Sequence, residues 1–194
     1  MAAPVQTVAV PQRRLTLTPI AFDLVLALSQ SPDGLRLAEL AERIGSPVSS
    51  VQTSLRVLMA NAIVARLAAD PPAYHLDPRH HAIGPLLRLA AVLPEPEHAI
   101  GILLRASRAV EFAVFDREGF VIAVADGSGS AEVERLESTI EMVLSARPTR
   151  SSIVTMRGPE LADRLRMEPE LWTRLVDARR IKGHLPSVGR VTPR

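Results

Sequence analysis

The sequence predicts an α+β protein: a helical N-terminal part ending in a β-hairpin, then connecting helices and a small C-terminal α/β domain. Three observations support this fold class. Apolar residues recur at helical spacing from residue 20 to residue 59. Strand-like runs separated by short turns follow at residues 63–76 and 110–125. The length of 194 residues and the apolar content of 47% suit one ordinary domain or two small ones.

The N-terminal helices are predicted from their end signals. Residues 1–16 lack an apolar period and are expected to form a flexible arm. Thr18-Pro19 is typical of an N-cap followed by proline at the first helical position, and the turn at residues 31–34 should end this helix. A second helix is predicted over Leu37–Ile44, with Gly45 as its C-terminal cap.

A third helix should begin almost at once, with Ser46-Pro47 as cap and first-turn proline, and end at Asn61. Its buried side is expected to carry Val48, Val51, Leu55, Leu58 and Met59. Residues 63–67 and 73–76 then form strand, turn and strand. Residues 17–80 are therefore expected to fold as one unit.

This order of elements has a use in DNA recognition. In a winged helix-turn-helix one helix braces a second that enters the major groove, and a β-hairpin follows. The outward side of the third helix should then be polar, and it carries Ser49, Ser50, Gln52, Thr53 and Arg56. Glutamine and arginine can bond base edges, and serines at a helix N-terminus favour a phosphate. Two further arginines are expected to contact phosphates, Arg66 on the hairpin and Arg79 after it.

The same stretch resembles known families in three segments, residues 20–28, 33–45 and 51–58. Together they are similar to the winged DNA-binding domains of bacterial regulators of the IclR, ArsR and MarR types. The resemblance covers about 60 of the 194 residues and implies transcription regulation. Those families usually have glycine after the recognition helix, where this chain has Asn61-Ala62. Asparagine tolerates the left-handed conformation, so the turn is expected to survive.

The second half of the chain changes to strand-rich sequence. Residues 81–108 are expected to form connecting helices, residues 109–186 a small α/β domain, and residues 187–194 a loose tail. Within the domain we expect strands at 110–115, 120–125 and 152–156 and helices at 130–146, 159–166 and 170–179.

This second half resembles the later part of the minimal nucleotidyltransferase fold, through Phe120–Asp126, the helix after it and Ile153–Met156. That family requires a Gly-Ser turn after its first strand and two carboxylates on the next strand to hold magnesium. Here the turn is residues 116–119, Asp-Arg-Glu-Gly, and strand 120–125 carries no carboxylate. The resemblance therefore implies a degenerate domain that has lost catalysis and serves in dimerisation or sensing.

Composition restricts the function classes further. The chain has no cysteine and no apolar run of the roughly 20 residues that span a bilayer, and Met1–Arg14 lacks a signal sequence, so a cytoplasmic location is expected. Arginine replaces lysine everywhere except at Lys182, which is typical of a GC-rich bacterial genome. The neighbouring His80 and His81 lack further ligands at metal spacing, so neither a metal site nor a cofactor is predicted.

Charge is unevenly distributed, with a net of −6 over residues 109–146 and +6 over residues 147–194. Two faces of opposite sign or a self-complementary contact between subunits would both explain this. The favoured hypothesis is a dimeric, non-enzymatic regulator of double-stranded DNA, with a protein partner or small-molecule effector left open. Two alternatives are a nucleotidyltransferase-related enzyme with relocated carboxylates and an antitoxin-like protein-interaction module.

Overall fold

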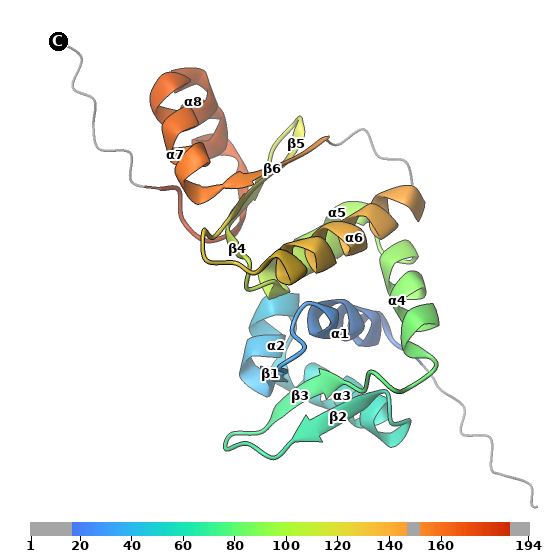
Figure 1. The fold of residues 1–194 in the computed structure, drawn as a ribbon. Coiled ribbons are helices and arrows are strands. Elements are labelled where there is room, and N and C mark those ends of the chain that lie inside the picture. The colour runs from blue at the N-terminus through green and yellow to red at the C-terminus, as the bar shows by residue number, and fades with distance from the viewer. Residues whose placement is uncertain (1–16, 147–151, 187–194) are drawn as a thin grey trace, which may run out of the picture.

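The chain is described here by a computed structural model that covers residues 17–146 and 152–186 (Figure 1). The predicted arm 1–16 and tail 187–194 lie outside the described residues. The elements follow in the order α1 Pro19–Ser29, β1 Leu35–Arg36, α2 Leu37–Ile44, α3 Val48–Ala60, β2 Val64–Leu67, β3 Ala73–Leu76, α4 Ile83–Val92, α5 Pro96–Ala106, β4 Val110–Phe115, β5 Gly119–Val124, α6 Ser130–Ala146, β6 Ser152–Arg157, α7 Gly158–Met167, α8 Pro169–Asp177 and β7 Arg179–Lys182.

The N-terminal part combines α1, α2 and α3 with a small antiparallel sheet of order β1-β3-β2. The predicted caps are confirmed: Thr18 Oγ1 accepts a hydrogen bond from Ala21 N at 3.3 Å, and Gly45 ends α2 with φ 67°. Strand β1 was not expected. Two residues are too short to show alternation, and Leu35 becomes a strand residue only because Tyr74 of β3 lies opposite it.

Three expectations around α3 are wrong. Pro47, not Ser46, occupies the N-cap position, and no side chain caps this end. Ala62 rather than Asn61 takes the positive φ, 56°, because Asn61 stays on the helix and donates from Nδ2 to the Val57 carbonyl at 2.8 Å. Val48 and Met59, expected on the buried side, are 48% and 37% exposed. Both residues lie at the border between the buried side of α3 and its exposed polar side.

The larger sheet has the order β6-β5-β4-β7. The predicted hairpin of β4 and β5 is confirmed, and β6 joins β5 in parallel. Strand β7 pairs antiparallel with β4 and was missed by the sequence analysis. The last predicted helix was extended to Arg179, whereas α8 ends at Asp177 and the chain then adds an edge strand.

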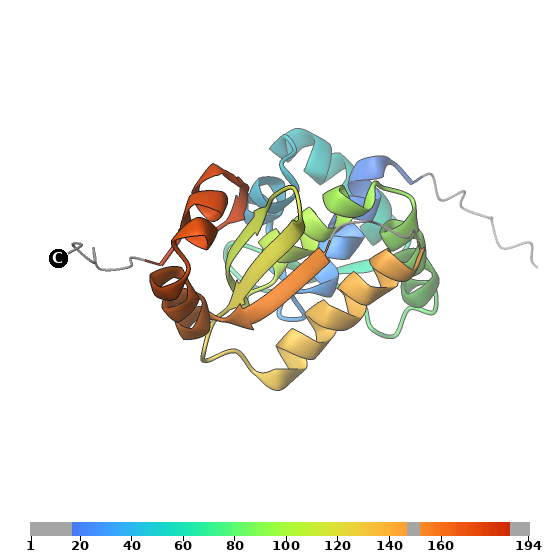
Figure 2. The same ribbon diagram turned by 90° about the horizontal axis from the view of Figure 1, so that it is seen from above.

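Helices cover both faces of this sheet. Ala113, Phe120 and Ile122 pack toward α5 and α6, whereas Phe112 and Val121 pack toward α7 and α8. Figure 2 shows α6 lying along one side of the sheet and the pair α7–α8 at the other. Burial on both faces explains why β5 is apolar at every position instead of alternating.

Helix α5 lies at the centre of the molecule. Residues Ile102–Leu104 are fully buried, and α5 packs against α1, α2, α6 and β7. One cluster of buried residues runs without interruption from α1 through α5 to β5. A buried hydrogen bond of 3.2 Å from Gln30 Nε2 to Thr139 Oγ1 also joins the end of α1 to α6. The helices expected as connectors are therefore part of a shared core. Within the described ranges no helix combines the length and apolar character that a bilayer crossing requires.

Candidate nucleic-acid interface

Helix α3 presents a polar side to solvent. Successive residues turn by about 100° around a helix, which gathers four of the five predicted contact residues within roughly a third of the circumference. These four are exposed: Ser49, Gln52, Thr53 and Arg56. In Figure 1 this helix lies behind β2 and β3, at the end of the molecule remote from α7 and α8. The structure thus brings these four side chains together on one accessible surface.

Ser50 and Thr53 have less freedom than the sequence suggested. Ser50 is only half-exposed, since it lies at the edge of the polar side. The Thr53 hydroxyl donates its proton to the Ser49 carbonyl at 3.0 Å, so toward a ligand it can act only as a hydrogen-bond acceptor. Such back-bonding to the preceding turn is common for threonine in helices. Gln52 and Arg56 have the longer reach of the set.

The inner side of α3 is fixed by packing. Val51 and Leu58 are fully buried, and Leu55 is 2% exposed. Ser54 is also buried, and its Oγ lies 3.2 Å from Thr18 Oγ1 at the start of α1. Apolar burial together with a hydrogen bond to another helix fixes the rotation of α3 about its own axis. The polar side therefore points in one direction, as a recognition helix requires.

The two predicted backbone-contact arginines are exposed but lie apart. Arg66 is on β2, opposite Tyr74 of β3. Arg79 follows β3 at the base of the hairpin, where its backbone N–H donates to Asp77 Oδ1 at 3.0 Å. Strand β2 leads away from that base toward the wing tip. Arg66 and Arg79 would therefore contact different phosphates of a bound DNA.

Val48 and Met59 are residues that sequence reasoning placed wrongly. Val48 precedes Gln52 by four positions and Met59 follows Arg56 by three, so both border the polar side. A helical projection centred on Gln52 would have found them. Exposed apolar groups beside base-reading side chains can contact a thymine methyl group. They widen the candidate interface.

The histidines after the hairpin interact locally. His80 Nδ1 accepts from Ala82 N at 3.2 Å, and the rings of His80 and His81 stack with centroids 4.9 Å apart. Among the residues described by the structure, no group of three histidine, aspartate or glutamate side chains could hold a metal ion.

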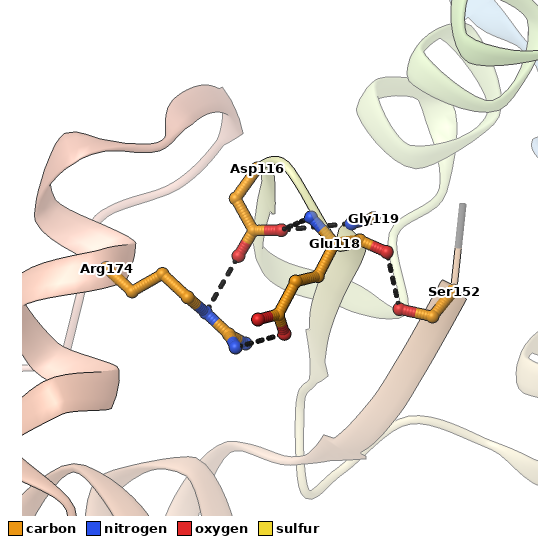
Figure 3. A network of polar contacts seen from close by, with 5 residues as sticks. All are labelled: Asp116, Glu118, Gly119, Ser152 and Arg174. Carbon is orange, nitrogen blue, oxygen red and sulfur yellow. Dashed lines mark hydrogen bonds and ion pairs between the residues drawn. The ribbon is translucent and has the colours of Figure 1, made fainter. Parts of the chain in front are cut away.

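The carboxylates of the β4–β5 turn are engaged by an arginine of α8 (Figure 3). Arg174 Nε lies 2.9 Å from Asp116 Oδ2, an ion pair without hydrogen-bond geometry, and its NH1 donates to Glu118 Oε2. Asp116 Oδ1 accepts from the backbone of Glu118 at 2.7 Å and of Gly119 at 2.9 Å. Ser152 Oγ donates to the Glu118 carbonyl at 2.7 Å. The side chain of Asp116 is 6% exposed. This network fastens α8 and β6 to the turn.

Asp126 follows β5 and therefore lies at the end of this strand opposite to Asp116 and Glu118. The strand has six residues and rises by about 3.3 Å per residue, which separates Asp126 from Glu118 by roughly 20 Å or more. Asp116 and Glu118 thus lie at one end of β5 and Asp126 at the other, so the three carboxylates do not share one site.

Comparison with known proteins adds one finding about the N-terminal part. Residues 19–68 match the IclR helix-turn-helix domain family. No curated protein and no solved structure matches the chain. Nothing in these comparisons identifies the C-terminal sheet and its helices. The matched segment begins with α1 and ends on the wing, so it contains the whole polar side of α3. Helix order, fixed rotation of α3 and family match together indicate a DNA-binding transcriptional regulator.

Proposed function

We propose that the protein binds a specific sequence of double-stranded DNA through α3 and regulates transcription as a homodimer. The observation that carries this proposal is the exposed polar side of α3 within the segment that matches the IclR helix-turn-helix domain. A major groove about 12 Å wide accepts one helix. The packing of Val51, Leu55 and Leu58 against the rest of the domain leaves that side free to enter it.

Each side chain has a role suited to its chemistry. Arg56 can donate two hydrogen bonds to guanine or one to a phosphate, and Gln52 can pair with an adenine edge. Ser49 and Ser50 stand in the first turn of α3, where the positive end of the helix dipole attracts a phosphate. The Ser50 N–H already donates to the Pro47 carbonyl at 3.0 Å, so Ser50 would contribute its hydroxyl. Thr53 accepts from a base amino group, and Arg66 and Arg79 neutralise backbone phosphates.

The test is DNA binding by two variants and a matched control. Genome-wide mapping of bound DNA first supplies the cognate site. Arg56→Ala should then weaken binding to that site by about 1–3 kcal/mol, and Gln52→Ala should add to the loss. Arg166→Ala on α7, where the side chain pairs with Asp163, removes an equal charge far from α3 and should leave affinity unchanged. Unchanged affinity of the Arg56, Gln52 double variant for every sequence would reject the recognition-helix assignment.

Helix α4 offers a surface for the second copy. Its exposed apolar residues, Leu89 at 47%, Val92 at 37% and Leu93 at 53%, fall on one side of the helix with Pro85. The other side, with Leu86 and Ala90, is buried. Three large apolar side chains on one helical face are typical of an interaction site. Because α4 directly follows the wing, pairing through it would hold two recognition helices in a fixed relation, as two half-sites require.

The dimer has its own test. Leu89→Glu with Leu93→Glu places charge on the α4 surface and should convert a dimer into a monomer in sedimentation equilibrium, with the helical circular dichroism preserved. Val176→Glu, at a residue 54% exposed on α8, is the control and should stay dimeric. A monomeric wild-type protein, or a double variant that remains dimeric, would contradict the α4 interface.

The C-terminal part is proposed to be a degenerate nucleotidyltransferase-like domain without catalytic activity. The engagement of Asp116 and Glu118 by Arg174 supports this, because carboxylates already paired with an arginine are poor magnesium ligands. Incubation with labelled nucleoside triphosphates and magnesium should give neither transfer nor binding. Transfer to any acceptor would restore the enzyme hypothesis.

A further inference from the structure

A cavity of about 360 Å³ lies between α5 and β7, away from α3. Through Glu97 and Arg179 it adjoins a second cavity, which the turn carboxylates Asp116 and Glu118 line. Its lining includes Gly101 and Arg105 on one side of α5, Arg179 at the start of β7, and His98. A volume of this size is at the lower limit of small-molecule sites. The place is also central, since α5 joins the helix-turn-helix part to the sheet.

The histidine in this cavity is held in place from behind. His98 Nε2 lies 3.1 Å from Oδ1 of Asp23, a residue of α1 that is 7% exposed. In the tautomer with its proton on Nε2, the ring donates to Asp23, and Nδ1 is left as an acceptor. A buried carboxylate that orients a half-exposed histidine is an arrangement that preorganises a binding group.

The arginine at the other end of the same helical side, Arg105, is bonded to a backbone carbonyl. Arg105 donates from Nε to the Arg43 carbonyl at 2.5 Å, and burial lowers its pKa, as does the neighbouring cation Arg179. Asp23 acts in the opposite direction but is already bound to His98. Glu95 and Glu97 also line the cavity, two turns or more before Arg105 and thus about 12 Å or more along the helix axis. A small anion beside Arg105 and Arg179 would relieve their repulsion.

Gly101 keeps this space open. Glycine inside a helix costs about 0.5–1 kcal/mol relative to alanine. A Cβ at Gly101 would lie 3.4 Å from the Arg105 NH1, so any longer side chain would enter the volume between Arg105 and His98.

We infer that the cavity binds a small ligand whose oxyanion group meets Arg105 and Arg179 and whose hydroxyl or amino group donates to His98. Guanidinium groups recognise phosphate and carboxylate oxygens by paired hydrogen bonds. Arg105, which would contact the ligand, also donates from Nε to the Arg43 carbonyl of α2, and α2 is the helix that braces α3. The site is independent of the proposed DNA contacts and can be tested without DNA.

The test is isothermal titration of the full chain with inorganic phosphate and, separately, with succinate, at constant ionic strength in chloride. The wild type should bind one of these two probes at one saturable site. Arg179→Gln should weaken that binding about tenfold or more, since a charge-assisted hydrogen bond is lost. Gly101→Leu retains every charge but fills the cavity, and should abolish it. Arg166→Gln on α7 is the matched control and should bind as the wild type does.

Two results would overturn the inference. One is the absence of saturable binding of either probe by a wild-type protein with a cooperative melting transition. The other is equal binding by the wild type, Arg179→Gln and Gly101→Leu. Because Gly101→Leu could fail to fold, its melting transition is recorded, and Arg179→Gln at an exposed edge-strand position decides alone if needed. DNA affinity measured in parallel separates failure of this site from failure of the recognition helix.

Discussion

Lys182, the single lysine of the chain, occupies a position that ties three elements together. Its Nζ donates to the Ser107 carbonyl at the C-terminal end of α5, and Arg43 of α2 donates to the neighbouring Ala106 carbonyl. Cations at a helix C-terminus complement the negative end of the helix dipole. Burial, together with the smaller effect of the neighbouring Arg43 cation, lowers the pKa of Lys182 to about 8.

This pKa predicts a pH dependence of stability. Between pH 8 and the ordinary lysine value of 10.5, the unfolded chain holds a proton on Lys182 that the folded chain has lost. Stability should therefore rise with pH across this window, because the unfolded state binds more protons. Urea unfolding of the wild type and of Lys182→Met at a series of pH values measures the difference. Parallel curves for the two proteins would contradict the lowered pKa.

At the scale of elements, the β4–β5 turn depends on the glycine that ends the predicted turn of residues 116–119. Gly119 has φ 141° and pairs with Ser152, and a Cβ there would lie 1.9 Å from the Ser152 carbonyl oxygen. Gly119→Ala should force β6 away from β5 and cost about 3 kcal/mol or more in the free energy of unfolding. Gly127→Ala, with no atom within 4 Å of the added Cβ, should change stability by less than about 1 kcal/mol. Equal melting temperatures for the two variants would contradict the prediction, because they would show that the turn accommodates a Cβ at Gly119 without loss of stability.

The same turn explains part of the charge division seen along the chain. Asp116 and Glu118 belong to the acidic segment 109–146, and Arg174 belongs to the basic segment 147–194. Arg157, also of the basic segment, donates to a backbone carbonyl of the acidic segment, that of Ala125, at 3.2 Å. Some of the opposite charge therefore acts inside one molecule, between α8 and the β4–β5 turn.

At the scale of the whole molecule, the shared core predicts cooperative unfolding. The larger buried cluster continues from α1 to β5 through α5, so the helix-turn-helix part shares its core with the sheet. A second cluster on the other face of the sheet joins the same strands to α7 and α8. Tyr74 on the wing and Trp172 on α8 are the single tyrosine and tryptophan, and they report on the two ends. Trp172 fluorescence, and Tyr74 fluorescence in a Trp172→Phe variant, should give the same midpoint.

A core substitution extends this prediction. Leu103→Ala removes a fully buried side chain at the centre of α5 and should lower both midpoints together, at a cost of about 2–5 kcal/mol. Two separate transitions, or a shift at one reporter alone, would show that the helix-turn-helix part and the sheet unfold as independent domains.

The candidate interface was predictable from sequence because its signals are local. Caps, turn residues and the 3.6-residue period of α1 to α3 depend on neighbours along the chain, and they located Ser49, Gln52, Thr53 and Arg56 on one side. Where the period was ambiguous, at Val48 and Met59, only packing against other helices decided which side was buried.

The sequence by itself determined most of the N-terminal elements, the polar side of α3 and the purely apolar character of β5. Tertiary structure alone decided that Arg174 pairs with both Asp116 and Glu118, that β7 completes the sheet, and that α5 is central to both parts. It also formed the cavity that brings His98, held by Asp23, near Arg105 and Arg179. Local conformational preferences act over a few residues, whereas these arrangements join residues tens of positions apart through burial and charge pairing that have no local signature.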